Sequence, residues 1–269
     1  MKALILFGLR QTLRVRLVVA VVAIAFLLEW MGLRLLREMT FSFQGIVYPI
    51  GSSRTMFVAL FLQLFAGSFI AAVYGIWLVP YLHQGARGQI SFCYPVSRWT
   101  YVVVYGVNVS VLLLILNIVM IGSFCNLFGV SAIVDDPLVL KGLWWGILTQ
   151  TLGLWTLMFA LATCSLAIGS IPAFFIGLFG FGFMQVLGGL FRVAIGGLVN
   201  SDSGFLYQLK QIYQWLPPWG ELIFELKSGL QGEINWSHVG LWVIWLTVFI
   251  LAFRFFIARP AYTRPDYSA

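Results

Sequence analysis

Charge is scarce in this sequence. Of its 269 residues only 9% are charged and 61% are hydrophobic, and the mean hydropathy is +0.96. A soluble domain is about 25% charged, and a water-soluble chain as apolar as this one would expose large apolar patches and aggregate. The composition therefore excludes a soluble domain and predicts an integral membrane protein.

Motifs that carry chemistry are also missing. The chain has no Gly-x-x-x-x-Gly-Lys-Ser/Thr loop for nucleotide phosphates and no serine in a nucleophile elbow. The two histidines, His83 and His238, lie far apart in the chain, and no group of His, Cys, Asp and Glu has the spacing of a metal site. The three cysteines, Cys93, Cys125 and Cys164, cannot form a disulfide framework. We therefore expect no catalytic residue, cofactor or metal in this chain.

Long apolar runs are what the sequence has in abundance. Six of them come close to or exceed the roughly 20 residues that a helix needs to cross a hydrocarbon core of about 30 Å. They cover residues 17–33, 56–81, 99–124, 143–166, 171–191 and 239–257, and Glu29 interrupts the first. The runs are continuous, whereas barrel strands alternate over about ten residues. The sequence thus predicts an all-α integral membrane protein with six transmembrane helices, forming one domain over residues 1–269.

The basic residues are distributed unevenly over this layout. With the N-terminus inside, the cytoplasmic segments hold nine basic residues and one acid, and the rest of the chain holds seven basic residues and eight acids. This is the bias of the positive-inside rule. It predicts a multi-pass protein of a bacterial inner membrane with both termini in the cytoplasm. The net charge of +7 then reflects topology and not nucleic-acid binding.

Three short helices are expected before the first span and between the fifth and sixth spans. Leucines and arginines in residues 1–16 fall on separate helical faces, which favours a helix lying in the inner interface; a plain basic anchor is the alternative. Residues 205–216 and 221–230 have helical spacing and are separated by two prolines. Tryptophans and tyrosines favour an outer interface for this pair. In the second helix, Glu221 and Glu225 are expected on the polar face.

Several polar and small residues lie inside the predicted spans. Polar groups are costly in lipid, so they line a translocation path or bond to neighbouring helices, and the second interpretation is the more common one. The candidates for a path are Gln63, Asn108, Asn117, Gln150 and Gln185. Gly67, Ala71 and Gly75 repeat every four residues, which predicts close approach of another helix.

The segment between the second and third spans, HQGARGQISFCYPVSRW at 83–99, has basic residues and no acid. Pro95 ends a helix, and Arg98 and Trp99 begin the next span at the lipid boundary. We therefore expect a short helix that lies flat at the inner surface. Such an element can receive a push from a cytoplasmic partner and tilt the two spans that it joins. The alternative is that Arg87 and Arg98 only anchor the topology.

This segment resembles the coupling helix of the membrane subunits of type-2 ABC exporters, which has a Glu-x-Gly-Thr … Pro-x-Ser-Arg pattern. The acid of that pattern is absent here, and Gln84 and Gln89 lie nearby. The layout is similar too: a basic N-terminal helix, six spans, a tight turn between the fourth and fifth, and two short outer helices before the sixth. The resemblance implies that contact with an ATPase subunit is made by Gln84, Gly85, Arg87, Gly88, Pro95, Ser97 and Arg98.

The function that the resemblance implies is that of a permease subunit. Two copies, identical or closely paralogous, would form the translocation path, and separate ABC ATP-binding subunits would hold ATP and Mg²⁺. One alternative is a mechanical transmitter of the ABC type that acts on a periplasmic partner protein, as in cofactor or metalloenzyme maturation. Another is a subunit of a non-ABC channel or membrane enzyme.

Overall fold

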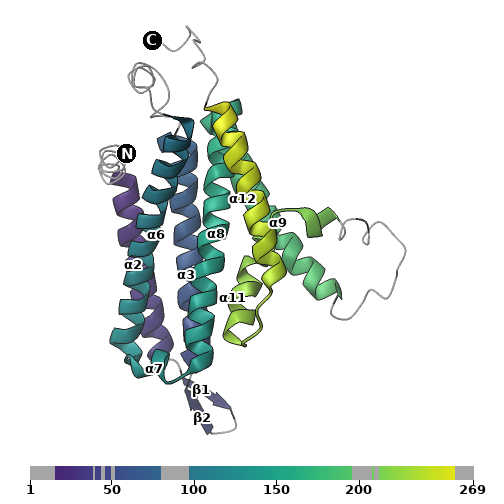
Figure 1. The fold of residues 1–269 in the computed structure, drawn as a ribbon. Coiled ribbons are helices and arrows are strands. Elements are labelled where there is room, and N and C mark those ends of the chain that lie inside the picture. Colours follow the sequence, from purple (N-terminus) through teal and green to yellow (C-terminus); the bar gives the residue numbers. More distant parts are fainter. Residues whose placement is uncertain are drawn as a thin grey trace.

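The protein is a bundle of long helices in this computed structural model, which describes residues 16–38, 40–43, 46–49, 52–79, 97–195, 208 and 212–257. Figure 1 shows α8 between α3 and α12, with α9 inclined away from the other long helices. The long helices are α2 (Arg16–Glu38), α3 (Ser52–Val73), α6 (Arg98–Phe128), α8 (Pro137–Ile168), α9 (Ser170–Ile195) and α12 (Trp236–Phe256). The short elements are β1 (Thr40–Phe43), β2 (Ile46–Pro49), the π-helical turn η1 (Tyr74–Leu78), α7 (Ser131–Val134), the 3₁₀ turn η2 (Pro218–Glu221) and α11 (Leu222–Leu230).

Among the described residues, five helical segments are long and apolar enough to cross a membrane. They are Thr55–Trp77, Arg98–Phe128, Pro137–Ile168, Ser170–Gly189 and Trp236–Phe256, with mean hydropathies from 1.8 to 2.5. The prediction of a helical membrane protein is thereby confirmed. α2 is a 23-residue helix at the position of the first predicted run, and its role as a sixth span stays a prediction. Residues 1–15 and most of the helix expected over 205–216 lie outside the described residues.

The bundle has two ends, which we name after Gly169 and Asp136. The Gly169 end carries the α8–α9 turn, the start of α6 and the end of α12 (Figure 1). The Asp136 end carries α7, the start of α8 and the β1–β2 hairpin. The hairpin pairs Thr40 with Pro49 and Phe43 with Ile46 in antiparallel register. The sequence analysis missed it, because four-residue strands in a loop leave little periodicity to detect.

α8 is the helix on which the others assemble, since α3, α9, α11 and α12 all contact it. Its start is fixed by Asp136, whose carboxylate accepts from the backbone N–H groups of Leu138 and Val139 at 3.0 and 3.3 Å. Pro137 occupies the first helical position, where its missing N–H leaves no bond unmade. The helix stops at Gly169, whose φ of +96° side chains rarely adopt. Only this residue separates α8 from α9, so the predicted tight turn is present.

Small residues let helices approach α8 closely. A Cβ atom on Gly75 would lie 2.7 Å from the Met158 carbonyl oxygen and 3.1 Å from the Ala162 backbone nitrogen. The helix contact predicted from the Gly67, Ala71, Gly75 repeat is therefore confirmed at its last position. α11 uses the same device, with the small residues on α8. Its leucines lie over α8 glycines, with Leu222 on Gly153, Leu226 on Gly146 and Leu230 on Gly142.

The close approach at Gly75 gives a test of the packing. Gly75→Ala should lower the free energy of unfolding by about 1–3 kcal/mol, because its Cβ meets the backbone of α8, which cannot rotate away. Gly122→Ala is the matched control in α6, with no atom within 4 Å of the added Cβ. Unfolding in mixed micelles of mild detergent and SDS measures both variants. Equal stability of the two would contradict the contact.

Candidate functional site

A layer of three amides joins α3, α6 and α8. The Gln63 Nε2 atom donates to the Asn117 Oδ1 atom at 2.5 Å, and the Asn117 Nδ2 atom donates to the Leu113 carbonyl oxygen at 2.8 Å. From α8, the Gln150 Nε2 atom donates to the Leu60 carbonyl oxygen at 2.6 Å. All three amides are buried. The layer fixes three long helices to one another at one depth.

The remaining two path candidates also bond between elements. The Asn108 Nδ2 atom donates to the Tyr74 hydroxyl at 3.0 Å, which connects α6 to the π-helical turn. The Gln185 Nε2 atom donates to the Trp219 carbonyl oxygen at 2.5 Å, which connects α9 to η2. All five candidates thus make the contacts expected of interhelical bonding. A role in lining a path stays a prediction that these contacts do not require.

The π-helical turn η1 is tied to the α8–α9 turn by two serines. A π turn widens the helix and leaves carbonyl groups available to partners, and it often occurs at functional positions. Here the Ile76 carbonyl oxygen accepts from the hydroxyls of Ser165 at 2.9 Å and Ser170 at 2.8 Å. The two hydroxyls are 3.1 Å apart. We call this arrangement the serine clamp: Ile76, Ser165 and Ser170.

The serine clamp lies at the helix end that precedes the predicted coupling segment in the chain. η1 ends at Leu78, and α6 begins at Arg98 with Ser97 as its N-cap residue. Ser97 and Arg98 are both exposed. The other residues predicted to contact an ATPase subunit, Gln84, Gly85, Arg87, Gly88 and Pro95, lie outside the described residues. The described helix ends thus flank the segment in the chain. The serine clamp connects the first of these ends, η1, to α8 and α9.

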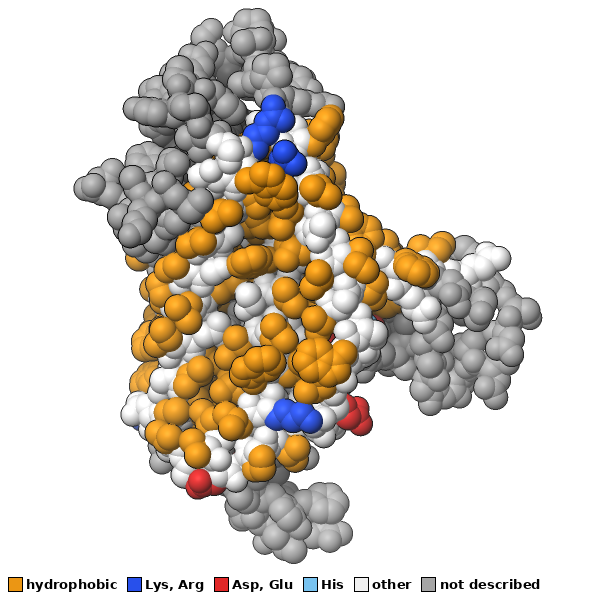
Figure 2. All heavy atoms as spheres, viewed as in Figure 1, with side chains coloured by type: hydrophobic (Ala, Val, Ile, Leu, Met, Phe, Trp, Pro, Cys, Tyr) orange, Lys and Arg blue, Asp and Glu red, His pale blue; other side chains and the backbone are white. Residues whose placement is uncertain are grey.

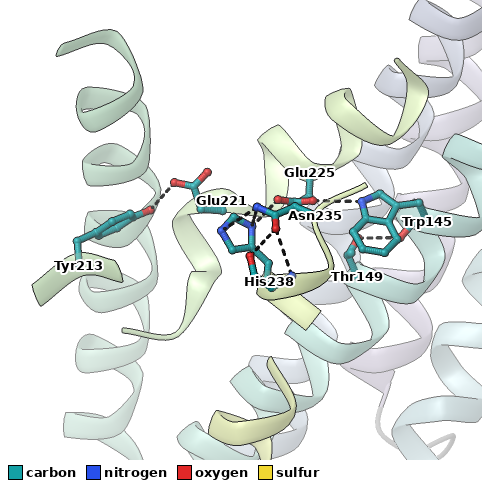
Figure 3. A network of polar contacts seen from close by, with 8 residues as sticks. Trp145, Thr149, Tyr213, Glu221, Glu225, Asn235 and His238 are labelled. Atoms are coloured by element: carbon teal, nitrogen blue, oxygen red, sulfur yellow. Dashed lines mark hydrogen bonds and ion pairs between the residues drawn. The ribbon is translucent and has the colours of Figure 1, made fainter. Parts of the chain in front are cut away.

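A second polar group links α11, α12 and α8 around Glu225 (Figure 3). Its side chain is 2% exposed, and the Oε1 atom lies 2.5 Å from the His238 Nδ1 atom. The other carboxylate oxygen accepts from the Trp145 indole N–H at 3.2 Å. Both oxygens are therefore engaged, as a buried carboxylate requires. Nearby, the Tyr213 hydroxyl donates to Glu221 at 3.2 Å.

The expectation for Glu225 was wrong. The sequence analysis put it on the polar face of its helix, but it follows Leu222 by three residues and precedes Leu226, so it shares their buried face. Helical spacing alone contains that signal. Its partners do not follow from local spacing, because Trp145 is 80 residues away along the chain. This group can lock α11 in place.

Neither a metal site nor a likeness to known proteins adds a candidate functional residue. In the described part of the chain, no group of three or more His, Cys, Asp or Glu residues is arranged to hold a metal ion. Cys125 and Cys164 are free thiols. No protein-family model matches the chain, and no curated protein matches it.

The Glu225–His238 contact gives a second test. Glu225→Gln and His238→Gln should each destabilise the protein, and the double variant should show a coupling energy of about 0.5–3 kcal/mol, because the two side chains are in direct contact. Glu233→Gln, on an exposed residue three positions after α11, is the control and should change stability by less than about 0.5 kcal/mol. Unfolding in mixed micelles measures all four variants. Strict additivity of the two substitutions would contradict the contact.

Proposed function

We propose that this chain is the permease subunit of an ATP-driven ABC exporter, coupled to separate ATP-binding subunits. The observation that carries the proposal is the serine clamp, which lies at the helix end that precedes the predicted coupling segment in the chain. A push that reaches η1 from this segment has a route to three helices, since Ile76 lies in η1, which continues α3, and the two serines flank the α8–α9 turn. The one-residue turn at Gly169 and the short elements η2 and α11 before α12 agree with the layout of that family.

The mechanism that follows is mechanical. ATP and Mg²⁺ act on the partner subunits, which close on each other and carry the coupling segments with them. The amide layer holds α3, α6 and α8 as one body. α9 has no part in this layer and is inclined away from the bundle, so we assign the change of angle to α9. A change in that angle alternates access to a path between two permease copies.

The sixth span and the orientation belong to the same proposal. α2 contacts α3 and α6 along its length and is taken as the first span. The Gly169 end, with Arg98 and Arg254, then faces the cytoplasm, and the Asp136 end faces outward. A cysteine placed at Gln231, which is exposed just after α11, would be labelled by an impermeant reagent from outside only.

The second copy is expected to cover α2 and α9. Both helices present apolar side chains that are about half exposed or more in the single chain. On α2 they include Ile24, Leu27, Met31 and Leu35; on α9 they include Ile171, Phe175, Phe179, Phe183 and Val186. Phe175 and Phe179 stack with their ring centroids 6.3 Å apart, which gives α9 a firm aromatic ridge. Crosslinks confined to α6 and α8 would contradict this placement.

The docking experiment tests the proposal directly. Arg87→Glu should weaken pull-down of the ATPase subunit while the permease stays inserted, because a reversed charge at an interface costs several kcal/mol. Lys227→Glu, an exposed basic residue of α11, is the matched control and should leave pull-down unchanged. Equal pull-down and equal coupled ATPase activity for both variants would remove Arg87 from the mechanism.

The serine clamp gives a separate prediction. Replacing Ser165 and Ser170 with alanine should leave docking intact but abolish most of the ATP-dependent movement of α9, because the Ile76 carbonyl loses both donors. Spin labels at position 186, near the far end of α9, report that movement across the dimer with ATP and vanadate. Ser110→Ala is the control, since its hydroxyl bonds the Gly106 carbonyl oxygen of its own helix at 2.8 Å. Full movement in the double variant would contradict the route.

A further inference from the structure

Two exposed arginines and a tryptophan lie at the Gly169 end of the bundle. Arg98 is the first residue of α6, and Arg254 lies in the last turn of α12. The Arg254 guanidinium carbon lies 4.8 Å from the centroid of the Trp99 ring, over its face. Both arginines are exposed, and Trp99 is 44% exposed. Two distant segments of the chain thus present charge and an aromatic surface together.

No acid opposes this charge in the described segments of the same end. Residues 74–79, 97–105, 163–175 and 250–257 contain no Asp or Glu. The His238–Glu225 ion pair lies elsewhere, near the start of α12. Figure 2 shows Lys and Arg side chains gathered on one face at this end, directly above an apolar surface.

The geometry suits a phosphate group. The Arg254 guanidinium lies over the Trp99 ring in a cation–π contact, which positions it beside the aromatic surface. Arginine edges bind phosphate through two parallel hydrogen bonds. Below them lie side chains that suit acyl chains, since Phe255 is 58% exposed beside Arg254. A basic site above exposed apolar helices matches the two parts of an anionic phospholipid.

We infer that Arg98, Trp99 and Arg254 form a binding site for the phosphate of an anionic phospholipid headgroup. Arg254 and Arg98 bind the phosphate, and Trp99 positions Arg254. The inference requires only that the helices lie in a membrane. It does not depend on an ATPase partner, and the exporter proposal does not depend on it.

Lipid competition on the isolated chain tests the site. The purified protein is equilibrated with equal amounts of phosphatidylglycerol and phosphatidylcholine in detergent, and the retained lipid is measured by native mass spectrometry. Wild type should favour phosphatidylglycerol by about thirtyfold, which corresponds to about 1 kcal/mol for each arginine. Arg254→Gln and Arg98→Gln should each reduce the preference about fivefold, and the double variant should abolish it.

Three controls make the outcome specific. Lys141→Gln and Lys227→Gln remove exposed charges elsewhere on the chain and should keep the wild-type preference. Trp99→Leu should reduce the preference with both arginines present, and Trp99→Phe should restore part of it. Inorganic phosphate in excess should displace little lipid if the acyl chains contribute. An unchanged preference in the arginine double variant, or an equal loss in the lysine variants, would overturn the inference. Complete displacement of the lipid by phosphate would also overturn it, because the site would then bind free anions.

Discussion

The hydrocarbon core of a bilayer offers no hydrogen-bond partners, and this constraint shapes the whole bundle. α8 shows how it is met. Thr149, Thr151, Thr156 and Thr163 each donate to a carbonyl oxygen one turn earlier in α8, at 2.7–2.9 Å. Gln150 instead donates to α3. Glycines of α8 admit the leucines of α11, so the helix whose threonines bond to its own backbone also brings its neighbours close.

The same constraint separates a rigid part of the molecule from a movable one. The amide layer and the Gly75 contact hold α3, α6 and α8 together at two depths. α9 has no part in the amide layer. It contacts the bundle at Ser170, packs Gly177 against Leu161 of α8, and bonds η2 through Gln185. A change in its angle would leave the amide layer intact. This division is what the proposed transmission needs.

The fold could be predicted from sequence wherever a single helix decides the outcome. Apolar runs gave the five long spans, Asp136-Pro137 marks the start of α8, and Gly67, Ala71 and Gly75 anticipated a close helix contact. Tertiary placement decided the rest. Glu225 is buried because α11 turns toward Trp145 and His238, and Ile76 accepts two hydroxyls because η1 widens beside a turn 90 residues later. Periodicity carries no information about such pairings, and the β1–β2 hairpin is too short to show any.

The central claim is that another subunit's ATP hydrolysis moves these helices. The most direct measurement is purification of the chain from its own membranes in mild detergent, with identification and counting of the subunits that remain bound. The account predicts a separate subunit with a phosphate-binding loop, present in equal number with this chain, in a complex that hydrolyses ATP. A fully folded, membrane-inserted chain that is purified without any ATP-hydrolysing subunit would contradict it.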